Sequence, residues 1–265
     1  MNLAHWTRLT VVALALASAA ACAKNGRVAP EGSAEPDKFL FDRGTEELGE
    51  KHWLTAREFF KQVTETYTSS PYRPDSKIGV GDTYLGENTP ESLVYAINEF
   101  REFLSYYPTN PRADYAQYKL GMAHFQQMRA PQRDQTETRN AIAEFETFVQ
   151  RYPDSDLIGE VREKLRESKD RLSDSSYLVG FFYYRIRWYP GAIDRLQAVI
   201  KDDPGYTRRD AAYFYLGESL VKNNRQAEAL PYYERLVAEF EQSEHMDDAQ
   251  RRIAELKAQT QAKAP

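Results

Sequence analysis

The sequence is poor in the features that most catalytic and nucleic-acid-binding sites need. Its 265 residues include one cysteine and four histidines, and no histidine lies within helical reach of another. Because an H-E-x-x-H motif is also missing, we expect no metal site. The formal net charge is -5 and is spread along the chain, so no basic face would attract nucleic acid.

Two kinds of enzyme site are also not expected. Gly79, Gly81 and Gly86 do not have the G-x-G-x-x-G spacing of a phosphate loop, and no strand pattern precedes them. Asp82 and Glu102 are expected on solvent-facing helix surfaces, where a carboxylate lacks the burial that would perturb its pKa. We therefore predict a protein that is not an enzyme and that needs no cofactor.

Long apolar runs are scarce, and the one at the N-terminus is typical of an export signal. Arg8 precedes the apolar run Leu9–Leu16, and small residues follow up to Ala21. Cys22 comes next and resembles the lipid-modified cysteine of a bacterial lipobox, although Ala19 stands where Leu is usual. The alternatives are an ordinary signal cleaved near Ala21 and an incidental thiol. Residues 1–21 are predicted to be the signal, and Cys22 the lipidation site.

The residues after the cysteine are predicted to form a tether. Residues 22–36 contain Ala, Gly, Pro and polar residues without periodicity, and a random coil of this length spans about 20 Å. By resemblance to lipoprotein sorting rules, the absence of Asp at position 23 favours the outer membrane. The expected location is therefore the periplasmic face of the outer membrane, through a lipid anchor.

From Asp37 onward the chain repeats one pattern. A small residue is followed four positions later by a large residue, and seven positions after that usually by an aromatic one. Pro follows at once in three copies, where it ends a helix. The five copies begin at Ala56, Ala96, Ala141, Ala192 and Ala229.

Glycine precedes these alanines in a way that is typical of tetratricopeptide (TPR) repeats. The gap is twelve residues after Gly44, Gly180 and Gly217, 17 after Gly79 and 20 after Gly121. Gly and Ala allow two antiparallel helices to approach closely. The sequence therefore predicts an all-α, TPR-type solenoid of about five helix-turn-helix repeats in two halves.

The predicted halves have a helix between them. The N-terminal half covers residues 37–155 with repeats one to three, and the C-terminal half covers residues 177–257 with repeats four and five. A connecting helix is predicted at 156–176, and a disordered tail at 258–265. The longer turns between paired helices are predicted at Gly86–Pro90 and Arg129–Thr138.

Three segments resemble the BamD family of outer-membrane-protein assembly factors, which are five-TPR lipoproteins. The first is Pro131-Gln-Arg-Asp-Gln-Thr-Glu-Thr138, similar to the family's P-x-R-D-Q-T-x-T segment. The second is Asp114-Tyr-Ala with Gly121, and the third is the run from Tyr177 to Tyr184. Trp188-Tyr-Pro190 departs from the family's Gly-containing turn, but Pro190 is acceptable in the first turn of a helix.

The resemblance implies a function and partners. Such proteins belong to the β-barrel assembly (BAM) complex with other BAM lipoproteins. Their N-terminal repeats hold unfolded outer-membrane β-barrel precursors, and their C-terminal repeats dock the POTRA domains of the BamA insertase subunit. The alternative is a periplasmic TPR adaptor that coordinates cell-envelope or cell-wall machinery, as the Tol-Pal-associated coordinator does.

The first helix of each TPR pair lines the inner groove of such arrays, and aromatic residues dominate the expected positions. An extended or helical peptide could lie against them, with Gln126 or Arg185 fixing its polar groups. Each residue could instead be part of the core. The predicted groove residues are Phe41, Tyr84, Tyr115, Tyr118, Met122, Phe125, Gln126, Tyr177, Tyr184, Arg185 and Phe214.

The R-D-Q-T segment has two local explanations besides partner binding. Asp134 and Glu137 have the spacing of a D-x-x-E capping box at a helix start. Arg133 could instead brace the inserted turn.

Overall fold

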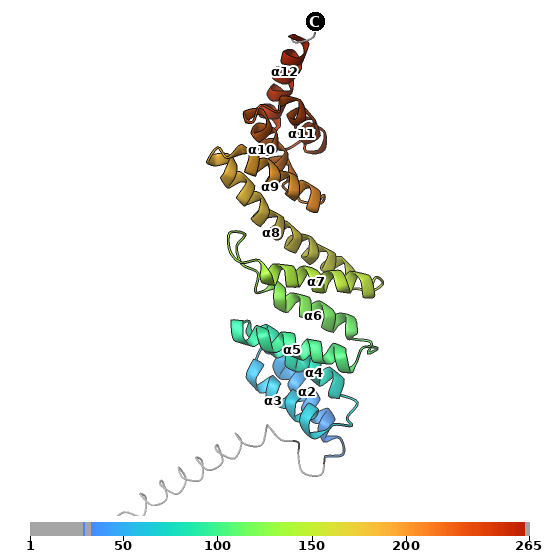
Figure 1. The fold of residues 1–265 in the computed structure, drawn as a ribbon. Helices are drawn as coiled ribbons and strands as arrows, with labels where there is room; N and C mark the ends of the chain where they lie inside the picture. Colours follow the sequence, from blue (N-terminus) through green and yellow to red (C-terminus); the bar gives the residue numbers. More distant parts are fainter. Residues whose placement is uncertain (1–28, 30–32, 263–265) are drawn as a thin grey trace, which may run out of the picture. The chain divides into compact units, whose positions relative to one another are not determined.

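The structure, a computed structural model, describes residue 29 and residues 33–262, and these contain helices and no strands (Figure 1). The fold is all-α and of the TPR type, as predicted. The helices are α2 (Pro36–Gly49), α3 (Trp53–Thr66), α4 (Arg73–Glu87), α5 (Pro90–Tyr106), α6 (Ala113–Phe125), α7 (Thr136–Arg151), α8 (Ile158–Arg185), α9 (Tyr189–Asp202), α10 (Arg209–Lys222), α11 (Gln226–Glu239) and α12 (Met246–Ala262).

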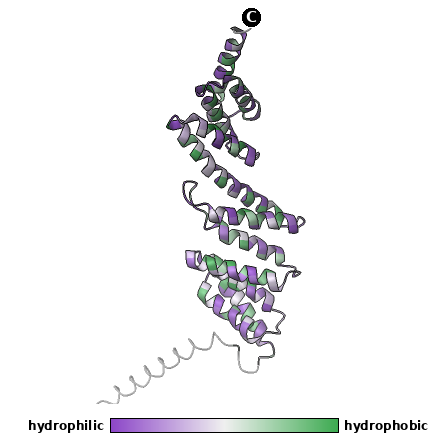
Figure 2. Cartoon of the chain, in the orientation of Figure 1, coloured by the Kyte–Doolittle hydropathy of each residue, from purple (hydrophilic) through white to green (hydrophobic). Residues whose placement is uncertain are grey.

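The chain divides into two compact units, one ending at Ala123 and the other beginning at His124. The N-terminal unit contains α2 to α5 and most of α6, and its core includes Phe59, Phe100 and Phe103. The C-terminal unit contains α7 to α12, and its core is centred on α9, α10 and α11. Apolar and polar residues alternate along most helices (Figure 2), which gives each an apolar face for this packing.

Glycines allow the two helices of a pair to approach each other closely. A Cβ at Gly44 would lie 2.8 Å from the Phe60 ring, and one at Gly217 would lie 2.6 Å from the Tyr233 ring. In each pair the glycine precedes its ring by sixteen residues. Because real Cβ contacts are never so short, these positions require glycine for the first helix to lie directly against the second.

The second repeat corrects one detail of the predicted register. Gly79, which the sequence pattern pairs with Ala96, packs against Phe60 of the preceding helix α3. Gly81 packs against Phe100 of α5, the second helix of its own pair, with a Cβ distance of 2.7 Å. The glycine equivalent to Gly44 and Gly217 is therefore Gly81, and the extra three residues lie at the start of α5, which has 17 residues where α3 and α11 have 14.

Three predicted boundaries differ from those observed. α8 runs without a break from Ile158 to Arg185, so the predicted connecting helix 156–176 and the first helix of the fourth repeat are one helix. The two units meet at residues 123 and 124 instead of 155 and 156. α12 continues to Ala262, so the tail predicted to be disordered from residue 258 is helical as far as 262.

The turns begin and end where local chemistry permits. Asn88 adopts φ 52° at the end of α4, and Thr89 and Ser92 form a capping box around Pro90 at the start of α5. Pro190 lies in the first turn of α9, as predicted. The Trp188 ring covers Gly191, where a Cβ would lie 2.6 Å from it.

The turn before α7 is organised by Gln135, and the predicted capping box of Asp134 and Glu137 is wrong. The buried Gln135 side chain donates hydrogen bonds to the carbonyl oxygens of Ala130 and Arg133 at 2.9 and 3.0 Å, and accepts one from Thr138. α7 begins at Thr136 without a side-chain cap. Asp134 instead accepts from the Thr136 amide, and Glu137 contacts His124 at 2.6 Å.

Candidate peptide-binding surface

The first helices of the N-terminal unit carry four of the predicted groove residues. Phe41 of α2 is half-buried and stacks on Tyr72 with a ring-centroid distance of 5.2 Å. Tyr84 of α4 is also half-buried, and the guanidinium of Arg57 lies 3.7 Å from its ring centroid. Tyr118 of α6 is 7% exposed and so adds mainly to the core. Phe41 and Tyr84 remain partly accessible to a ligand.

Tyr115, the fourth, contacts a buried carboxylate that the sequence pattern assigns to solvent. Its hydroxyl donates to Asp82 Oδ2 at 3.0 Å. Burial raises the pKa of Asp82 to about 6, although Lys119, the Tyr115 hydroxyl and Arg112 act in the opposite direction. The Oδ1 atom of Asp82 is buried and has no hydrogen-bond partner among the described residues. The expectation of an exposed, unperturbed Asp82 is therefore wrong, because α6 covers it.

Glu102, the other carboxylate considered for catalysis, is exposed and binds the Lys77 ammonium at 2.7 Å. Lys77 also contacts Glu99 at 2.9 Å. This side chain is thus part of a surface ion pair between α4 and α5.

Three predicted residues lie at the start of the C-terminal unit or next to it. Phe125 is half-buried, and its ring meets Phe145 edge-on with a centroid distance of 6.3 Å. The Lys164 ammonium lies 4.7 Å from the Phe125 centroid. Gln126 is exposed, and Met122 in the preceding turn is half-buried. Of these, Phe125 and Gln126 offer accessible apolar and polar groups side by side in sequence.

Aromatic rings from α8 and α10 form a continuous cluster in the C-terminal unit. Tyr177 is 4% exposed and stacks on Phe181, whose ring lies 4.7 Å from that of Tyr215. Tyr184 lies 5.1 Å from Tyr215. Two of these rings, Phe181 and Tyr215, were not predicted. Tyr184 is half-buried and Arg185 is exposed, so they border this cluster on the accessible side.

Phe214 extends the cluster to the residue that precedes α12. Its ring stacks on the His245 imidazole at 4.4 Å with an interplanar angle of 2°. Tyr215 meets the same imidazole edge-on at 5.4 Å. The aromatic cluster thus reaches from α8 across α10 to the start of α12.

Glu218 of α10 is buried and fully paired. It accepts hydrogen bonds from the Tyr233 hydroxyl at 2.8 Å and from two guanidinium nitrogens of Arg252 at 2.6 and 2.9 Å. These bonds raise the pKa of Arg252. Through Arg252 the carboxylate fastens α12 to α10.

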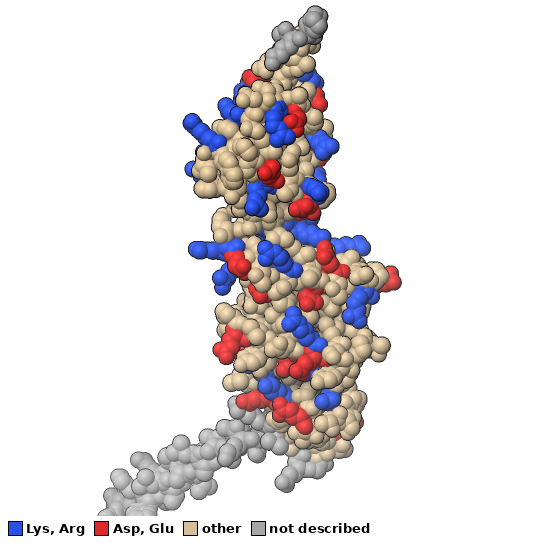
Figure 3. Space-filling view, viewed as in Figure 1, with Lys and Arg blue, Asp and Glu red and all other residues tan. Residues whose placement is uncertain are grey.

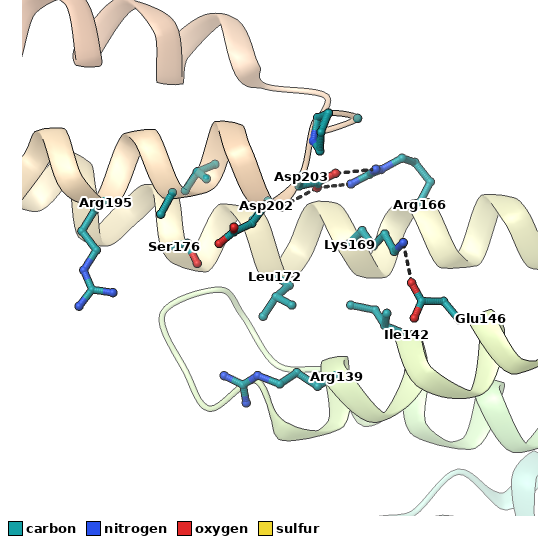
Figure 4. A pocket seen from close by; sticks show the side chains of 15 residues that line it. Arg139, Ile142, Glu146, Arg166, Lys169, Leu172, Ser176, Arg195, Asp202 and Asp203 are labelled. Atoms are coloured by element: carbon teal, nitrogen blue, oxygen red, sulfur yellow. Dashed lines mark hydrogen bonds and ion pairs between the residues drawn. The ribbon is translucent and has the colours of Figure 1, made fainter.

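A cavity of about 730 Å³ lies between α7, α8 and α9 (Figure 4). Arg166 on its wall binds Asp203 at 3.0 Å, and these bonds and one from Ser173 lower the pKa of Asp203 against the opposing effect of burial. Asp203 stands where four other repeats have Tyr or Phe. Because a carboxylate is smaller than a ring, the space between the helices stays open here. Its lining is polar, and none of it was predicted.

One exposed cluster contains histidine and two carboxylates. His52 Nδ1 lies 2.8 Å from Glu47 and 3.2 Å from Glu50, at the turn between α2 and α3. These ligand atoms lie within 4.8 Å of one another. Arg43 binds the other Glu47 oxygen at 2.9 Å, so the cluster is already balanced by a cation.

Comparison with known proteins identifies the family. A family model described as YfiO, outer membrane lipoprotein, matches residues 33–226. The chain belongs to this family. A tetratricopeptide repeat model also matches residues 211–243, which include α11 and most of α10.

Relatives of this lipoprotein family from three bacteria share a name, outer membrane protein assembly factor BamD. The chain is 29% identical to the Caulobacter vibrioides protein over 220 residues, 83% of this chain and 70% of that protein. It is 24% identical to the Neisseria meningitidis serogroup B protein, over 72% of this chain and 75% of that one. It is also 24% identical to the Vibrio cholerae protein, over 72% of this chain and 81% of that one.

Solved structures of other repeat proteins resemble the chain less closely. The crystal structure of MamA protein is 18% identical with a TM-score of 0.35, over 78% of this chain and 92% of that chain. The TPR2AB domain of yeast Sti1 in its pHSP90 complex is 10% identical with a TM-score of 0.41, over 85% and 100%. Sequence similarity therefore assigns the chain to the YfiO family.

The features that would anchor a member of this lipoprotein family remain predictions. The signal, Cys22 and most of the tether lie outside the described residues. Within residues 33–262, every helix is too short or too polar to traverse a bilayer. On the face shown in Figure 3, basic and acidic side chains are interspersed.

Sequence reasoning missed Phe181, Tyr215 and Glu218 in this family member, and it did not predict that Asp82 is buried. Asp82, Phe181 and Glu218 each come directly after the glycine that packs on the second helix, namely Gly81, Gly180 and Gly217. The signal for Asp82 was present in the double glycine of α4, but only packing distinguishes Gly81 from Gly79. Tyr215 gave no signal because its position is not expected to face the groove.

Proposed function

We propose that the chain is an outer-membrane scaffold component of the β-barrel assembly complex, held at the periplasmic face by a lipid on Cys22. The first helices of the three N-terminal repeats would hold unfolded β-barrel precursors, and the C-terminal repeats would dock POTRA domains of a BamA-like insertase beside other BAM lipoproteins. The observation that carries this proposal is the family match across residues 33–226. Its relatives are named outer membrane protein assembly factors.

The accessible aromatic side chains supply the chemistry for holding a precursor. Phe41, Tyr84 and Phe125 are half-buried, so each presents part of a ring while its base is fixed by neighbours. Rings held in this way bind apolar and aromatic side chains with little loss of rotamer entropy. Holding requires no bond to be made or broken.

The same reasoning applies to insertase docking at the C-terminal unit. Tyr184 and Arg185 border the aromatic cluster of α8 and α10. A ring beside a free guanidinium is a frequent arrangement at protein interfaces, because it offers apolar area and a directed charge together. We expect Arg185→Ala to weaken binding of purified insertase periplasmic domain more than Arg162→Ala, an exposed arginine earlier on α8.

Depletion of the protein followed by membrane fractionation tests the function. The expected result is that β-barrel proteins disappear from the outer membrane and accumulate as unfolded periplasmic species. Persistence of the barrels with a failure of cell-wall constriction would instead establish the TPR adaptor function.

A binding measurement tests the surface. The double substitution Tyr115→Ala with Phe125→Ala should weaken binding of a precursor peptide with an aromatic C-terminal segment by about tenfold. This loss corresponds to about 1.4 kcal/mol of binding free energy. The matched control is Leu54→Ala with Tyr106→Ala, which removes exposed apolar groups from the second helices. Circular dichroism must show both variants folded. Unchanged affinity in the first variant would remove the proposed surface.

A further inference from the structure

A crevice of about 560 Å³ lies between α9, α10 and α11, away from the predicted groove residues. Its walls are formed by two consecutive second helices and the start of the first helix between them. It is called the C-terminal crevice below. The lining residues are Gln197, Ile200, Lys201, Pro204, Arg209, Tyr213, Tyr232 and Arg235.

The N-terminal unit has an equivalent crevice of about 360 Å³ between α3, α4 and α5. The glycine register aligns Gly81 with Gly217 and Phe100 with Tyr233. In this N-terminal crevice Lys77 binds Glu99 and Glu102, and Arg73 donates to the Tyr107 hydroxyl at 3.1 Å. Lys77 and Arg73 are therefore satisfied by partners that line the same crevice.

The aligned positions of the C-terminal crevice have the opposite charge. Lys201 aligns with Glu65, and Arg235 aligns with Glu102. Both side chains are exposed and form no salt bridge with any residue of the described segment 33–262. The equivalent of Lys77 is Tyr213, and that of Glu99 is Tyr232. The three glutamates that line the N-terminal crevice thus have no acidic counterpart at the aligned positions of the C-terminal crevice, two of which carry cations.

A third cation, Arg209, is incompletely satisfied at the same place. Its Nη2 binds Glu239 at 3.2 Å. Its Nε is buried and has no hydrogen-bond partner among the described residues. A buried donor without a partner is destabilising, and an acceptor entering the crevice would relieve that cost.

The crevice also offers aromatic surface. Tyr213 is buried, and the Tyr232 ring lies 6.2 Å from it. Tyr232 is half-buried and its hydroxyl accepts from Gln197 at 3.5 Å. A ligand in the crevice would therefore meet the Tyr232 ring together with the exposed cations Lys201 and Arg235.

We propose that the C-terminal crevice binds an acidic peptide segment in which carboxylates flank an aromatic or apolar side chain. Lys201 and Arg235 would pair with the carboxylates, and Tyr232 would contact the apolar group. A recess between helices admits side chains but not a flat bilayer surface. The net charge of -5 disfavours extended polyanions, so attraction is limited to a short segment.

Fluorescence anisotropy with the full chain tests this. The probe is a fluorescein-labelled, terminally blocked peptide of sequence Gly-Asp-Phe-Glu-Asp-Gly, and its control has Asn and Gln in place of the acids. We expect the acidic peptide to bind and the control to bind at least tenfold more weakly. Raising the salt from about 50 mM to about 300 mM should weaken the acidic peptide severalfold, because exposed ion pairs are screened.

Charge-reversal variants test whether the acidic peptide binds at the C-terminal crevice. Lys201→Glu with Arg235→Glu should weaken the acidic peptide at least tenfold. The matched control, Arg162→Glu with Lys222→Glu, makes the same charge change at exposed residues of α8 and α10 outside the crevice and should change affinity less than threefold. Equal loss in both variants, no loss in the first, or equal binding of the uncharged peptide would each overturn the proposal.

Competition experiments distinguish binding of a carboxylate-containing peptide from binding of phosphate or of a lipid headgroup. Inorganic phosphate at about 10 mM is expected to leave most of the peptide bound, and vesicles containing anionic lipid are expected not to displace it. Full displacement by either would overturn the assignment to an acidic peptide. The proposal is independent of β-barrel assembly, because these measurements need no precursor or insertase.

Discussion

Each of the two units has a carboxylate at the same repeat position, but the two carboxylates differ in their hydrogen-bond partners. Asp82 and Glu218 each follow the glycine that packs on the second helix of the pair. Glu218 receives two bonds from Arg252 and one from Tyr233. Asp82 receives one bond from Tyr115, and its other oxygen is buried without a partner among the described residues.

The difference follows from side-chain length and donor geometry. Lys119 occupies the place in α6 that Arg252 occupies in α12, since Asp114-Tyr-Ala-Gln aligns with Asp247-Asp-Ala-Gln. Lys119 acts on Asp82 at a distance without forming a salt bridge, and its ammonium lies 5.1 Å from the Tyr115 ring centroid. Asp is one methylene shorter than Glu, and Lys lacks the forked guanidinium of Arg.

The comparison shows that the same repeat position can fasten the next helix or leave a titratable group within the packing. In the C-terminal unit the carboxylate secures α12. In the N-terminal unit it remains strained, with its pKa raised by burial. Stability of the two units should therefore respond differently to mutation and to pH.

The largest expected effect is that of Arg252→Ala. Removing the guanidinium leaves Glu218 as an unpaired buried charge, which costs about 3–5 kcal/mol. Denaturant unfolding monitored by circular dichroism measures the loss. Lys119→Ala is the matched control in the other unit and should cost below about 1 kcal/mol. Equal losses of stability would show that Lys119 stabilises Asp82 as much as Arg252 stabilises Glu218, and would contradict this comparison.

Gly217→Ala should have the next largest effect. Its Cβ would lie 2.6 Å from the buried Tyr233 ring, and such overpacking costs about 1–3 kcal/mol. It would also displace the hydroxyl that binds Glu218. Gly159→Ala on α8, where nothing lies within 4 Å of the added Cβ, should be neutral or slightly stabilising. A stable Gly217→Ala protein would disprove the glycine register.

Asp82→Asn should be stabilising at neutral pH. The folded pKa of about 6 lies above the ordinary aspartate pKa of 3.8, so the folded state binds a proton more tightly than the unfolded state. The wild-type protein therefore loses stability as pH rises from about 4 through about 6. The variant should gain about 3 kcal/mol at pH 8 and little at pH 4.

Unfolding experiments at these two pH values measure this difference. Glu218→Gln is the comparison, because it removes a carboxylate that already has its partners and should destabilise. A gain of stability that is the same at both pH values would contradict the raised pKa of Asp82.

Much of the fold was predictable, because the repeat depends on residue types whose effects on helix packing and helix ends are local. The small residues at Ala56, Ala96 and Ala192 and the prolines after the second helices follow from close packing and chain direction. The repeat register led to the wrong boundary between residues 176 and 177, although no Gly or Pro lies there to end a helix. A long amphipathic pattern is compatible with one helix or two.

The candidate surface was predictable only in part, because the helical face on which a residue lies does not determine how deeply its side chain is buried. Tyr118 and Tyr177 have the expected spacing, yet both are almost fully buried. The solvent-facing assignment of Asp82 failed because burial there comes from α6, which is more than thirty residues away in sequence. The role of Gln135 depends on the path of a turn that local patterns do not encode.

Site-directed photo-cross-linking in cells tests the central claim, that first-helix aromatic side chains hold β-barrel precursors. A photoreactive phenylalanine at Phe41, Tyr84 or Phe125 is compared with one at Leu54 or Tyr106. The account predicts cross-links to newly exported β-barrel precursors from the first group and far fewer from the second. Equal labelling from both groups, or labelling from the second group alone, would contradict it.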